Sequence, residues 1–525
     1  HAAITNKNAW NYTWENILSY NTTIAKDHNI GGSVITSWNK NQNDSSLAAA
    51  SGQMVDRWSF WRLASGASQH VESDFAQTQK MSFAVRFNYS YKGKYLFTFS
   101  NRWDGVSQFS AGHKWDSFPA GAIAWRISDE PFMNVAKNWL NNLKLRVGYG
   151  ITGNSGGVDA YGTTTQAYVY TGNGLTLNGQ NSSFTQYTGT YGSKDLGWEK
   201  SYNWNVGLDY GILNNRVDGS IEWFKTTTKG LLFKRTLPIT SGLTGWGSPL
   251  SIWQNIAETS NQGVEVTINS HNIKTKDFSW TTSLNLSHNK NKIVKLADLP
   301  EFIDGNYIRK EGCSYATIYL REYAGVDPND GRPMYYDNKE DENGNRSRNI
   351  VYDPNDADRV ELKDIYPKLT GGLMNTFNYK FIDLSFNLSF HLGGYSYDGA
   401  MYALQDDGYT AQYNKSTELR RRWKQPGDIT DVPRYVYGQE YGGWWNSSRG
   451  VHSTDHLRLK SLIVGVSAPQ SWLRTIGINS ARIYFSGTNL LTWAAYDQYD
   501  PELNGIVSYF TPPLKTFAFG LELKF

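Results

Sequence analysis

The last ten residues of the chain, TFAFGLELKF, separate apolar from polar side chains with a period of two. The apolar set is Phe517, Phe519, Leu521, Leu523 and Phe525, and the positions between them are small or polar. Successive side chains of a strand point to opposite faces, so this pattern predicts a strand with one apolar and one polar face. Its length suits a strand that crosses a membrane, about 9–11 residues, with lipid on one side and water on the other.

Two further segments repeat the alternation. In residues 382–392, Leu384 and Phe386 alternate with Asp383 and Asn387, and the pattern continues to the end of the segment. In the predicted hairpin 264–287 the apolar positions alternate with Glu265, Thr267, Asn269, Ser283, Asn285 and Ser287. One such segment fits any half-buried sheet, whereas repetition along the chain favours a transmembrane antiparallel β-barrel.

The composition excludes several other classes of protein. With a mean hydropathy of -0.55, the chain has no run of about 18 apolar residues, the minimum for a membrane helix. Aromatic residues make up 15% of the chain, which suits the aromatic girdles of an outer-membrane barrel but equally suits a secreted sugar-binding β protein. The net charge of +3 argues for neither a nucleic-acid partner nor an acidic one. Cys313 is the only cysteine, so no internal disulfide can form.

No linker, low-complexity run or shift in composition divides the 525 residues, so we expect one all-β domain over residues 1–525. Reading the alternating segments, we expect about fifteen strands, the first at 12–24. Short connections are expected at 26–29, 92–93, 128–139, 213–215, 272–276, 379–380 and 469–479. Long connections are expected at 41–77, 152–200, 230–260, 291–369, 394–454 and 492–513, with a briefer one at 106–113.

Short and long connections alternate, as they do in bacterial outer-membrane barrels. This predicts that the long loops are extracellular and that the carboxy terminus is periplasmic. An odd number of strands cannot close a single-chain bacterial barrel, because such barrels have even strand numbers. The chain also opens on His1 and has no signal peptide. We therefore expect an amino-terminal part that has been cut away or lies on another chain, with roughly seven strands of a plugged barrel of about 22.

A series of segments then indicates a family. The chain resembles, along essentially its whole length, the carboxy-terminal half of the SusC/RagA group of TonB-dependent outer-membrane transporters from Bacteroidetes. No single segment is diagnostic, but their order is specific. They are KYLFTFSNRWDGVSQF (94–109), FPAGAIAWRISDEPF (118–132), LKLRVGYGITGN (143–154), NVGLDYGILNNRVDGSIEWF (205–224), NQGVEVTI (261–268), AGVDPNDGRPMYYD (324–337), PKLTGGLMNTFNYKFIDLSF (367–386), RRWKQPGDITDVPRY (421–435), DHLRLKSLIVGVSAP (455–469) and SGTNLLTWAAYDQYDPELNG (486–505).

The resemblance implies TonB-dependent import of an oligomeric nutrient across the outer membrane of a Gram-negative bacterium. It implies a SusD-like surface lipoprotein over the extracellular loops, and TonB acting through the plug of the absent amino-terminal part. A glycan is the expected cargo, with an oligopeptide as the runner-up. No bond is broken in such a process, so we expect neither an enzyme nor a cofactor. The signal peptide and TonB box are expected outside this chain.

Three motifs that suggest catalysis or metal binding have simpler interpretations. Residues 153–157 spell GxSxG, but no helical period follows, as a nucleophile elbow requires. His452 and His456 stand at a strand entrance, where four residues span roughly 13 Å, too far to share a metal. The acidic stretch 337–345 resembles a calcium loop faintly, but it lacks the closing glutamate, which favours an exposed turn.

The candidate substrate-binding residues lie in the long loop 394–454. Trp444 and Trp445, with Tyr441, could stack on sugar rings, because aromatic faces pack on the apolar faces of sugars. Asp406 and Asp407 are adjacent and so point apart on an extended chain, which argues against a glycosidase acid pair. We interpret them as solvated loop acids or acceptors for sugar hydroxyls.

The polar faces of the strands provide a second set of candidates. Asp383, Asn387, Glu265, Asn285 and Glu522 would line or hydrate a passage, unless they only satisfy one another across the wall. Two rivals remain at this stage: a secreted carbohydrate-binding or carbohydrate-cleaving β protein, and a passive porin. The secreted protein would bury Leu384, Phe386, Phe517 and Phe519 in a core, whereas a barrel presents them to lipid.

Overall fold

The structure is a computed structural model. It describes residues 1–165, 167–170, 176–177, 180–181, 184–187, 190–241, 244–245, 248–296, 300–438, 446–473, 477–503, 505–507 and 510–525. No helix in these ranges is long and apolar enough to cross a membrane.

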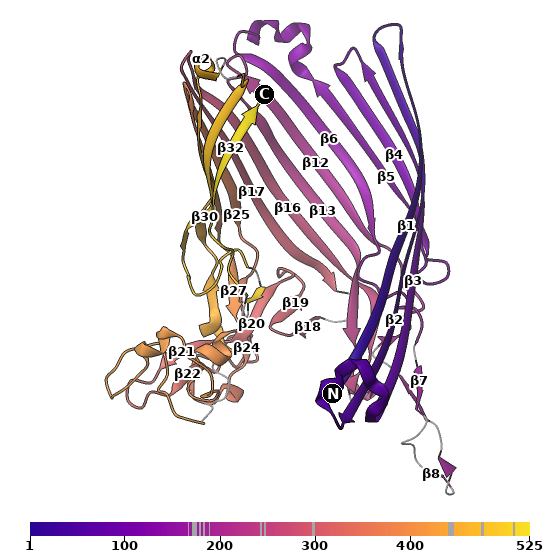
Figure 1. The fold of residues 1–525 in the computed structure, drawn as a ribbon, viewed down its shortest axis with the longest axis vertical. Coiled ribbons are helices and arrows are strands. Elements are labelled where there is room, and N and C mark those ends of the chain that lie inside the picture. The colour runs from indigo at the N-terminus through magenta and orange to yellow at the C-terminus, as the bar shows by residue number, and fades with distance from the viewer. Residues whose placement is uncertain are drawn as a thin grey trace. The chain divides into compact units, whose positions relative to one another are not determined.

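One antiparallel sheet of 15 strands dominates the fold, as the alternation predicts. Each strand pairs with the next strand of the sheet along the chain (Figure 1). In order the strands are β1 (Ala2–Ile24), β2 (His28–Gln53), β3 (Gly66–Tyr91), β4 (Tyr95–Val106), β5 (Trp115–Arg126), β6 (Leu140–Asn154), β12 (Glu199–Ile212), β13 (Val217–Thr236), β16 (Ser251–Lys274), β17 (Phe278–Leu296), β25 (Leu369–Tyr379), β26 (Ile382–Leu392), β29 (His456–Ser467), β30 (Ser480–Ala494) and β32 (Thr516–Lys524). The short strand β11 (Thr190–Tyr191) adds to β16 in parallel.

The short connections occur where the sequence predicts them. Between β3 and β4, for example, only residues 92–94 leave the ladder. Lys92 and Gly93 there have φ angles of 52° and 67°. Two consecutive residues with positive φ form the tight hairpin turn whose twist matches that of its strands. The expected connections at 128–139 and 469–479 are also confirmed, and they contain η2 (Ile127–Asp129), η3 (Pro131–Ala136) and α2 (Gln470–Leu473).

The prediction of a long loop at 41–77 is wrong for most of that range. Strands β2 and β3 stay paired from His28↔Tyr91 to Gln53↔Gly66, and only residues 54–65 separate them. Here β2 reads QNDSSLAAASGQ, which is small or polar on both faces. A strand whose two faces are both mostly small or polar shows no alternation, so sequence reasoning ends it too early. The first strand likewise begins earlier than predicted, at Ala2, and loop 230–260 shrinks to 237–250.

The chain forms two compact units, of which the first comprises residues 1–127, 145–206 and 225–259. Its long strands β1 to β3 lie side by side (Figure 1). A buried cluster, including Phe109, Phe118 and Trp198, packs the loops of this unit. Its smaller elements are η1 (Asp56–Ser65), β7 (Ala167–Tyr170), β8 (Thr176–Leu177), β9 (Gln180–Asn181), β10 (Phe184–Tyr187), η4 (Ile239–Ser241), β14 (Thr244–Gly245) and β15 (Ser248–Pro249).

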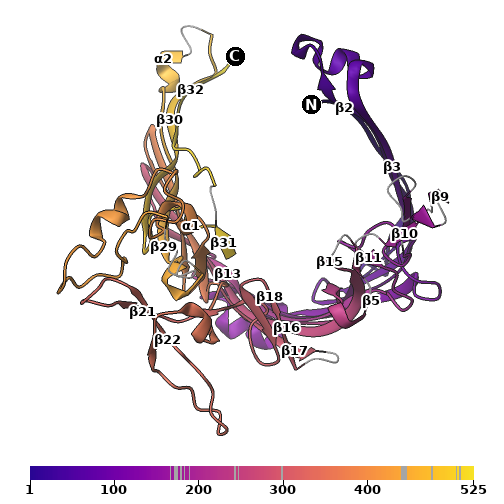
Figure 2. The same ribbon diagram turned by 90° about the horizontal axis from the view of Figure 1, so that it is seen from below.

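The second unit comprises residues 128–144, 207–224 and 260–525. Its long loops fold into small sheets, and Figure 2 shows the loop with β21 and β22 extending away from β29 and β30. The first small sheet contains β18 (Glu301–Asp304), β19 (Tyr307–Lys310), β20 (Thr317–Arg321) and β24 (Arg359–Asp364). The second contains β21 (Tyr323–Val326), β22 (Pro333–Tyr336) and β23 (Ile350–Val351). The third contains β27 (Tyr395–Asp398), β28 (Val451–Ser453) and β31 (Gly505–Val507). Short helices η5 (Pro354–Asp356), α1 (Met401–Leu404), η6 (Thr417–Arg421) and η7 (Ser448–Gly450) complete these loops.

The apolar face of the strands is not a core. Phe517 and Phe519 on β32 are 62% and 81% exposed, and Leu384 and Phe386 on β26 are only partly buried. A secreted β protein would bury these side chains, because burial of apolar surface drives its folding. The structure therefore contradicts that rival.

Candidate functional site

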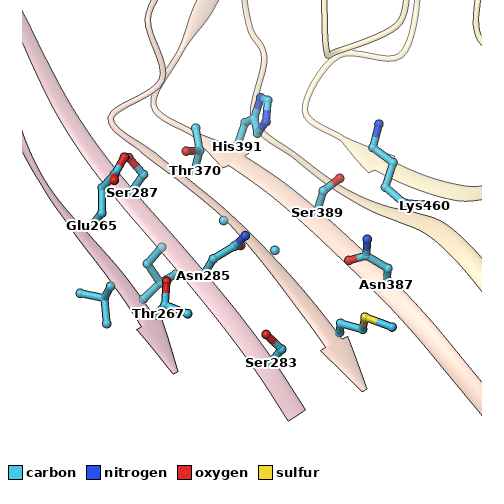
Figure 3. Close-up of a pocket in the computed structure, with 15 residues that line it drawn as sticks. Glu265, Thr267, Ser283, Asn285, Ser287, Thr370, Asn387, Ser389, His391 and Lys460 are labelled. Atoms are coloured by element: carbon cyan, nitrogen blue, oxygen red, sulfur yellow. The ribbon is translucent and has the colours of Figure 1, made fainter. Parts of the chain in front are cut away.

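The polar face of the second unit contains a hollow of about 790 Å³. Polar side chains from β16, β17, β25, β26 and β29 line it (Figure 3). We call it the polar hollow, and its labelled members are Glu265, Thr267, Ser283, Asn285, Ser287, Thr370, Asn387, Ser389, His391 and Lys460.

Strand register explains why these side chains share one face. Asn285 on β17 stands opposite Gly372 on β25, and Gly372 stands opposite Ser389 on β26. Two residues along, Met374 stands opposite Asn387. Because residues directly opposite in an antiparallel pair point to the same side, the alternation of each strand adds up to a continuous polar surface. The predicted lining residues Glu265, Asn285 and Asn387 are thus brought together.

Gly372 makes room within this surface. A Cβ atom at this position would lie 2.8 Å from Oδ1 of Asn285. That separation is shorter than a van der Waals contact, so any larger residue would displace the Asn285 amide. The missing side chain lets the amide lie across β25, and this is one reason that the wall is hollowed here.

Neutral donors and acceptors dominate the lining. Ser287 donates to Oε1 of Glu265 over 3.4 Å, whereas the enclosed Oγ of Ser389 has no hydrogen-bond partner among the described residues. Hydroxyl and amide groups both donate and accept. The hollow can therefore bind a solute that presents many hydroxyl or amide groups.

An ionic cluster borders the hollow on β29. Arg458 is 3% exposed, and it donates to Asp500 over 2.7 Å and to Glu502 over 3.0 Å. Lys460 lies 2.6 Å from the same Glu502 carboxylate. This cluster ties the segment after β30 to the polar face of β29. Its buried arginine is compensated, as a buried charge must be.

Sequence reasoning missed Lys460 because the register of β29 shifts between Leu459 and Ser461. An extra residue in one strand interrupts the alternation. The weak signal in the sequence is the run LKSLIV, in which apolar residues stop alternating.

The other two predicted lining residues, Asp383 and Glu522, both interact with Arg482. Asp383 accepts two hydrogen bonds from Arg482, over 3.0 and 2.7 Å, and Glu522 lies 3.5 Å from the same guanidinium. Asp383 and Glu522 therefore fit the alternative given in the sequence analysis, in which polar residues form interactions across the wall instead of lining a passage.

Asp406 and Asp407 are not solvated, which corrects that interpretation. They are 1% and 2% exposed. Lys415 lies 2.7 Å from Oδ1 of Asp406, and the backbone N–H of Thr410 donates to Asp406 over 2.5 Å. Asp406 therefore holds its own loop together, since burial of a carboxylate requires such partners. Trp444, Trp445 and Tyr441 lie outside the described residues, so stacking on cargo stays a prediction for them.

The two histidines pack against different partners. The His452 ring stacks on Tyr496 with centroids 3.7 Å apart, whereas His456 packs on His391 with centroids 4.7 Å apart.

In the acidic stretch 337–345, Asp341 accepts from the backbone N–H groups of Asn343 and Asn345. The bond from Asn345 contributes most to lowering the pKa of the Asp341 carboxyl. A closed turn of this kind uses the carboxylate internally.

The GxSxG segment has a packing role at its first glycine. Gly153 lies against the Phe118 ring. A Cβ atom at position 153 would lie only 2.2 Å from Cζ of that ring. Turns and irregular backbone follow β6 through residue 165, where a nucleophile elbow requires a helix.

A wall of antiparallel strands with an exposed apolar face and a hollowed polar face defines the membrane β-barrel class. The sequence places the chain more narrowly. A profile of the family described as "TonB dependent receptor-like, beta-barrel" matches residues 3–312. The chain belongs to this family, and within it to the SusC/RagA group of TonB-dependent outer-membrane transporters, of which it has the barrel portion.

Individual relatives agree with this assignment. TonB-dependent receptor P3 of Formosa agariphila is 32% identical over 565 residues, covering 99% of this chain and 53% of the relative. TonB-dependent receptor SusC of Bacteroides thetaiotaomicron is 31% identical over 468 residues, covering 85% of this chain and 44% of SusC. A structure of the RagAB peptide transporter matches with a TM-score of 0.84 and 25% identity, over 99% of this chain and 56% of that one. The chain thus spans about half the length of the relatives it matches.

Proposed function

We propose that this chain is the carboxy-terminal barrel portion of a TonB-dependent importer that takes up an oligomeric nutrient, most simply a glycan, across the outer membrane. The observation on which the proposal depends is the polar hollow in a strand wall that belongs to this family. Outer-membrane location follows from the family and from the apolar strand face.

The neutral lining supports a glycan as cargo. Hydroxyl and amide groups such as those of Ser389, Asn285 and Asn387 match the alternating donors and acceptors of sugar hydroxyls. The resemblance to the SusC/RagA group implies the same class, whereas the likeness to the RagAB peptide transporter supports an oligopeptide as the alternative. In either case the chain's residues bind and release, and no covalent bond changes.

The proposal includes partners and orientation. The relatives are about twice as long as this chain. An amino-terminal segment with the plug would pair with the outer edges of β1 and β32, each of which has a single neighbour in the described sheet. TonB would act through that plug. The long loops would be extracellular, beneath a SusD-like lipoprotein, and the carboxy terminus would be periplasmic, as the alternation of short and long connections predicts despite a brief connection after β4.

The experiment is uptake by the complete transporter. Cells that express the full-length protein with its lipoprotein should import labelled oligosaccharides only when TonB is present. A parallel conductance measurement on the purified protein separates active import from a passive pore. Uptake that persists without TonB, together with ion conductance, would show a porin and contradict the proposal. Uptake of oligopeptides alone would select the alternative cargo.

A further inference from the structure

The loop between β17 and β25 contains a second cavity, of about 610 Å³. It lies in the small sheet of β18, β19, β20 and β24, in the loop region beyond the long strands of the second unit (Figure 1). Ile308 and Ala357 contribute buried apolar side chains, and Tyr319 adds an aromatic one. Two of its arginines, Arg321 and Arg359, are directly opposite each other in the β20–β24 pair. We call this cavity the arginine pocket.

Two like charges directly opposite on one face of a sheet repel each other. Arg321 donates to Oδ1 of Asn355 over 3.5 Å, and Arg359 donates to the carbonyl of Gly305 over 3.2 Å. Both of these acceptors are uncharged. In the part of the chain that the structure describes, no carboxylate lies within 4.0 Å of either guanidinium.

The Arg321 guanidinium is also incompletely satisfied. Its Nε atom is enclosed and has no hydrogen-bond partner among the described residues. Burial, and next the charge of Arg359, lowers the pKa of Arg321. An enclosed donor without an acceptor costs free energy.

The other charges of the pocket are mostly neutralised. Lys310 lies 2.9 Å from Glu361 and 3.5 Å from Glu301. Arg346 lies 3.8 Å from Glu340. Asp358 is exposed and lies next to Arg359 in the chain, and it is the remaining carboxylate of the lining. The lining has four cationic and four acidic side chains and is neutral as a whole, but its unpaired cations, Arg321 and Arg359, lie together at one place.

We infer that the arginine pocket binds the carboxylate of an acidic cargo oligosaccharide between Arg321 and Arg359. Guanidinium groups bind carboxylates with paired, charge-assisted hydrogen bonds. The anion would offset the repulsion between the two arginines. The apolar and aromatic lining suits the face of a sugar ring. This inference rests on the proposed import function and narrows its cargo to a uronate-containing glycan.

The test is binding to the purified full-length transporter with its lipoprotein, measured by calorimetry. Trigalacturonic acid is compared with its methyl ester, which has the same rings without the charge. We expect the acid to bind at least about tenfold more tightly than the ester, because charge-assisted hydrogen bonds are the stronger ones. Arg321→Gln and Arg359→Gln should each remove most of that preference.

Arg346→Gln is the matched control, because Arg346 lines the same pocket but already pairs with Glu340. It should change the affinity for the acid less than about threefold. Arg321→Lys, which keeps the charge but loses the bidentate geometry, should give an intermediate loss. Heat-modifiable migration on gels verifies that each variant is folded.

The inference is overturned if acid and ester bind alike, or if Arg346→Gln weakens binding as much as the other two variants. It is also overturned if triglycine is preferred over its amide more strongly than the acid is preferred over its ester, since the pocket would then select peptides. If TonB-dependent uptake is normal in Arg321→Gln and Arg359→Gln and shows no charge preference, the inference about the arginine pocket is wrong. The proposed import function is not contradicted by that result.

Discussion

At the scale of residues, the polar hollow depends on where side chains are missing as much as on where they are. Gly372 leaves space that the Asn285 amide occupies, in the middle of a polar face. Its neighbour Gly371 faces the other way, where a Cβ atom would lie 2.5 Å from the Phe390 ring. The pair of glycines thus serves both faces of β25, one for solute and one for packing.

Gly372→Phe should fill the hollow and reduce uptake, by at least about tenfold if cargo passes this surface, because a phenylalanine side chain buries 150–250 Å² of surface. Gly372→Ala should stay within about threefold, since it displaces only the Asn285 amide. The measurement is the initial rate of TonB-dependent uptake, normalised to the folded protein in the membrane. Equal rates for the phenylalanine variant and the wild type would show that cargo takes another route.

The sequence predicts residues of the polar hollow but not those of the arginine pocket. Glu265, Asn285 and Asn387 follow from alternation alone, because the strand fixes their side. Arg321 and Arg359 did not emerge, because they are 38 positions apart by number and only the pairing of two short loop strands brings them together. Such contacts leave no periodic signal.

At the scale of elements, the sheet of β27, β28 and β31 joins two long loops through a buried polar group. His452 on β28 stacks on Tyr496, and Tyr496 donates to Asp398 on β27 over 2.9 Å. Burial, and next the positive charge of Arg449, lowers the pKa of His452 to about 4. The nearby Asp431 opposes this shift.

This pKa predicts that the loop sheet weakens in acid. A histidine has a pKa of about 6.5 when unfolded, so between pH 6.5 and about 4 the open state binds more protons than the folded state. Stability is therefore full above pH 6.5 and falls as the pH drops through this window, by up to about 3 kcal/mol. Hydrogen exchange at residues 451–453, corrected for intrinsic rates, should show faster opening at pH 4.5 than at pH 7.

His452→Phe keeps a ring against Tyr496 and should remove this part of the pH dependence. Asp398, whose pKa burial raises, titrates in the opposite sense in both proteins. The difference between wild type and variant therefore reports on His452. If both proteins show the same pH dependence, the assignment to His452 is wrong.

Elements also show where sequence patterns stop being informative. The hairpin turns were predictable, because each follows a change from alternation to turn residues. The end of β2 and the start of β3 were not, since side chains that are mostly small or polar on both faces lack the alternation that defines a strand in a sequence. The small loop sheets depend on pairing between distant segments, such as Ser396 with Gly505, and were likewise invisible.

At the scale of the whole molecule, the contact of each strand with hydrocarbon on one side and water on the other determines the alternation of its side chains. A strand that separates hydrocarbon from water must alternate, and that requirement made the fold class and the number of strands predictable from sequence. The identity of the cargo cannot be predicted from this alternation, because it depends on a few side chains of the loops and the lumen.

The most direct test of the account is the side of β26 on which each residue meets lipid. Cys313→Ser removes the thiol of this chain, and any cysteine of the amino-terminal part is replaced likewise. Single cysteines at positions 384–390 of the full-length transporter in bilayers then receive a nitroxide label. Accessibility to oxygen, which dissolves in lipid, is compared with accessibility to a water-soluble nickel complex. We predict that labels at Leu384, Phe386, Leu388 and Phe390 favour oxygen, and that labels at Ser385, Asn387 and Ser389 favour nickel. Labels that show no alternation, or apolar positions shielded from both reagents, would contradict a wall between lipid and a solute pathway.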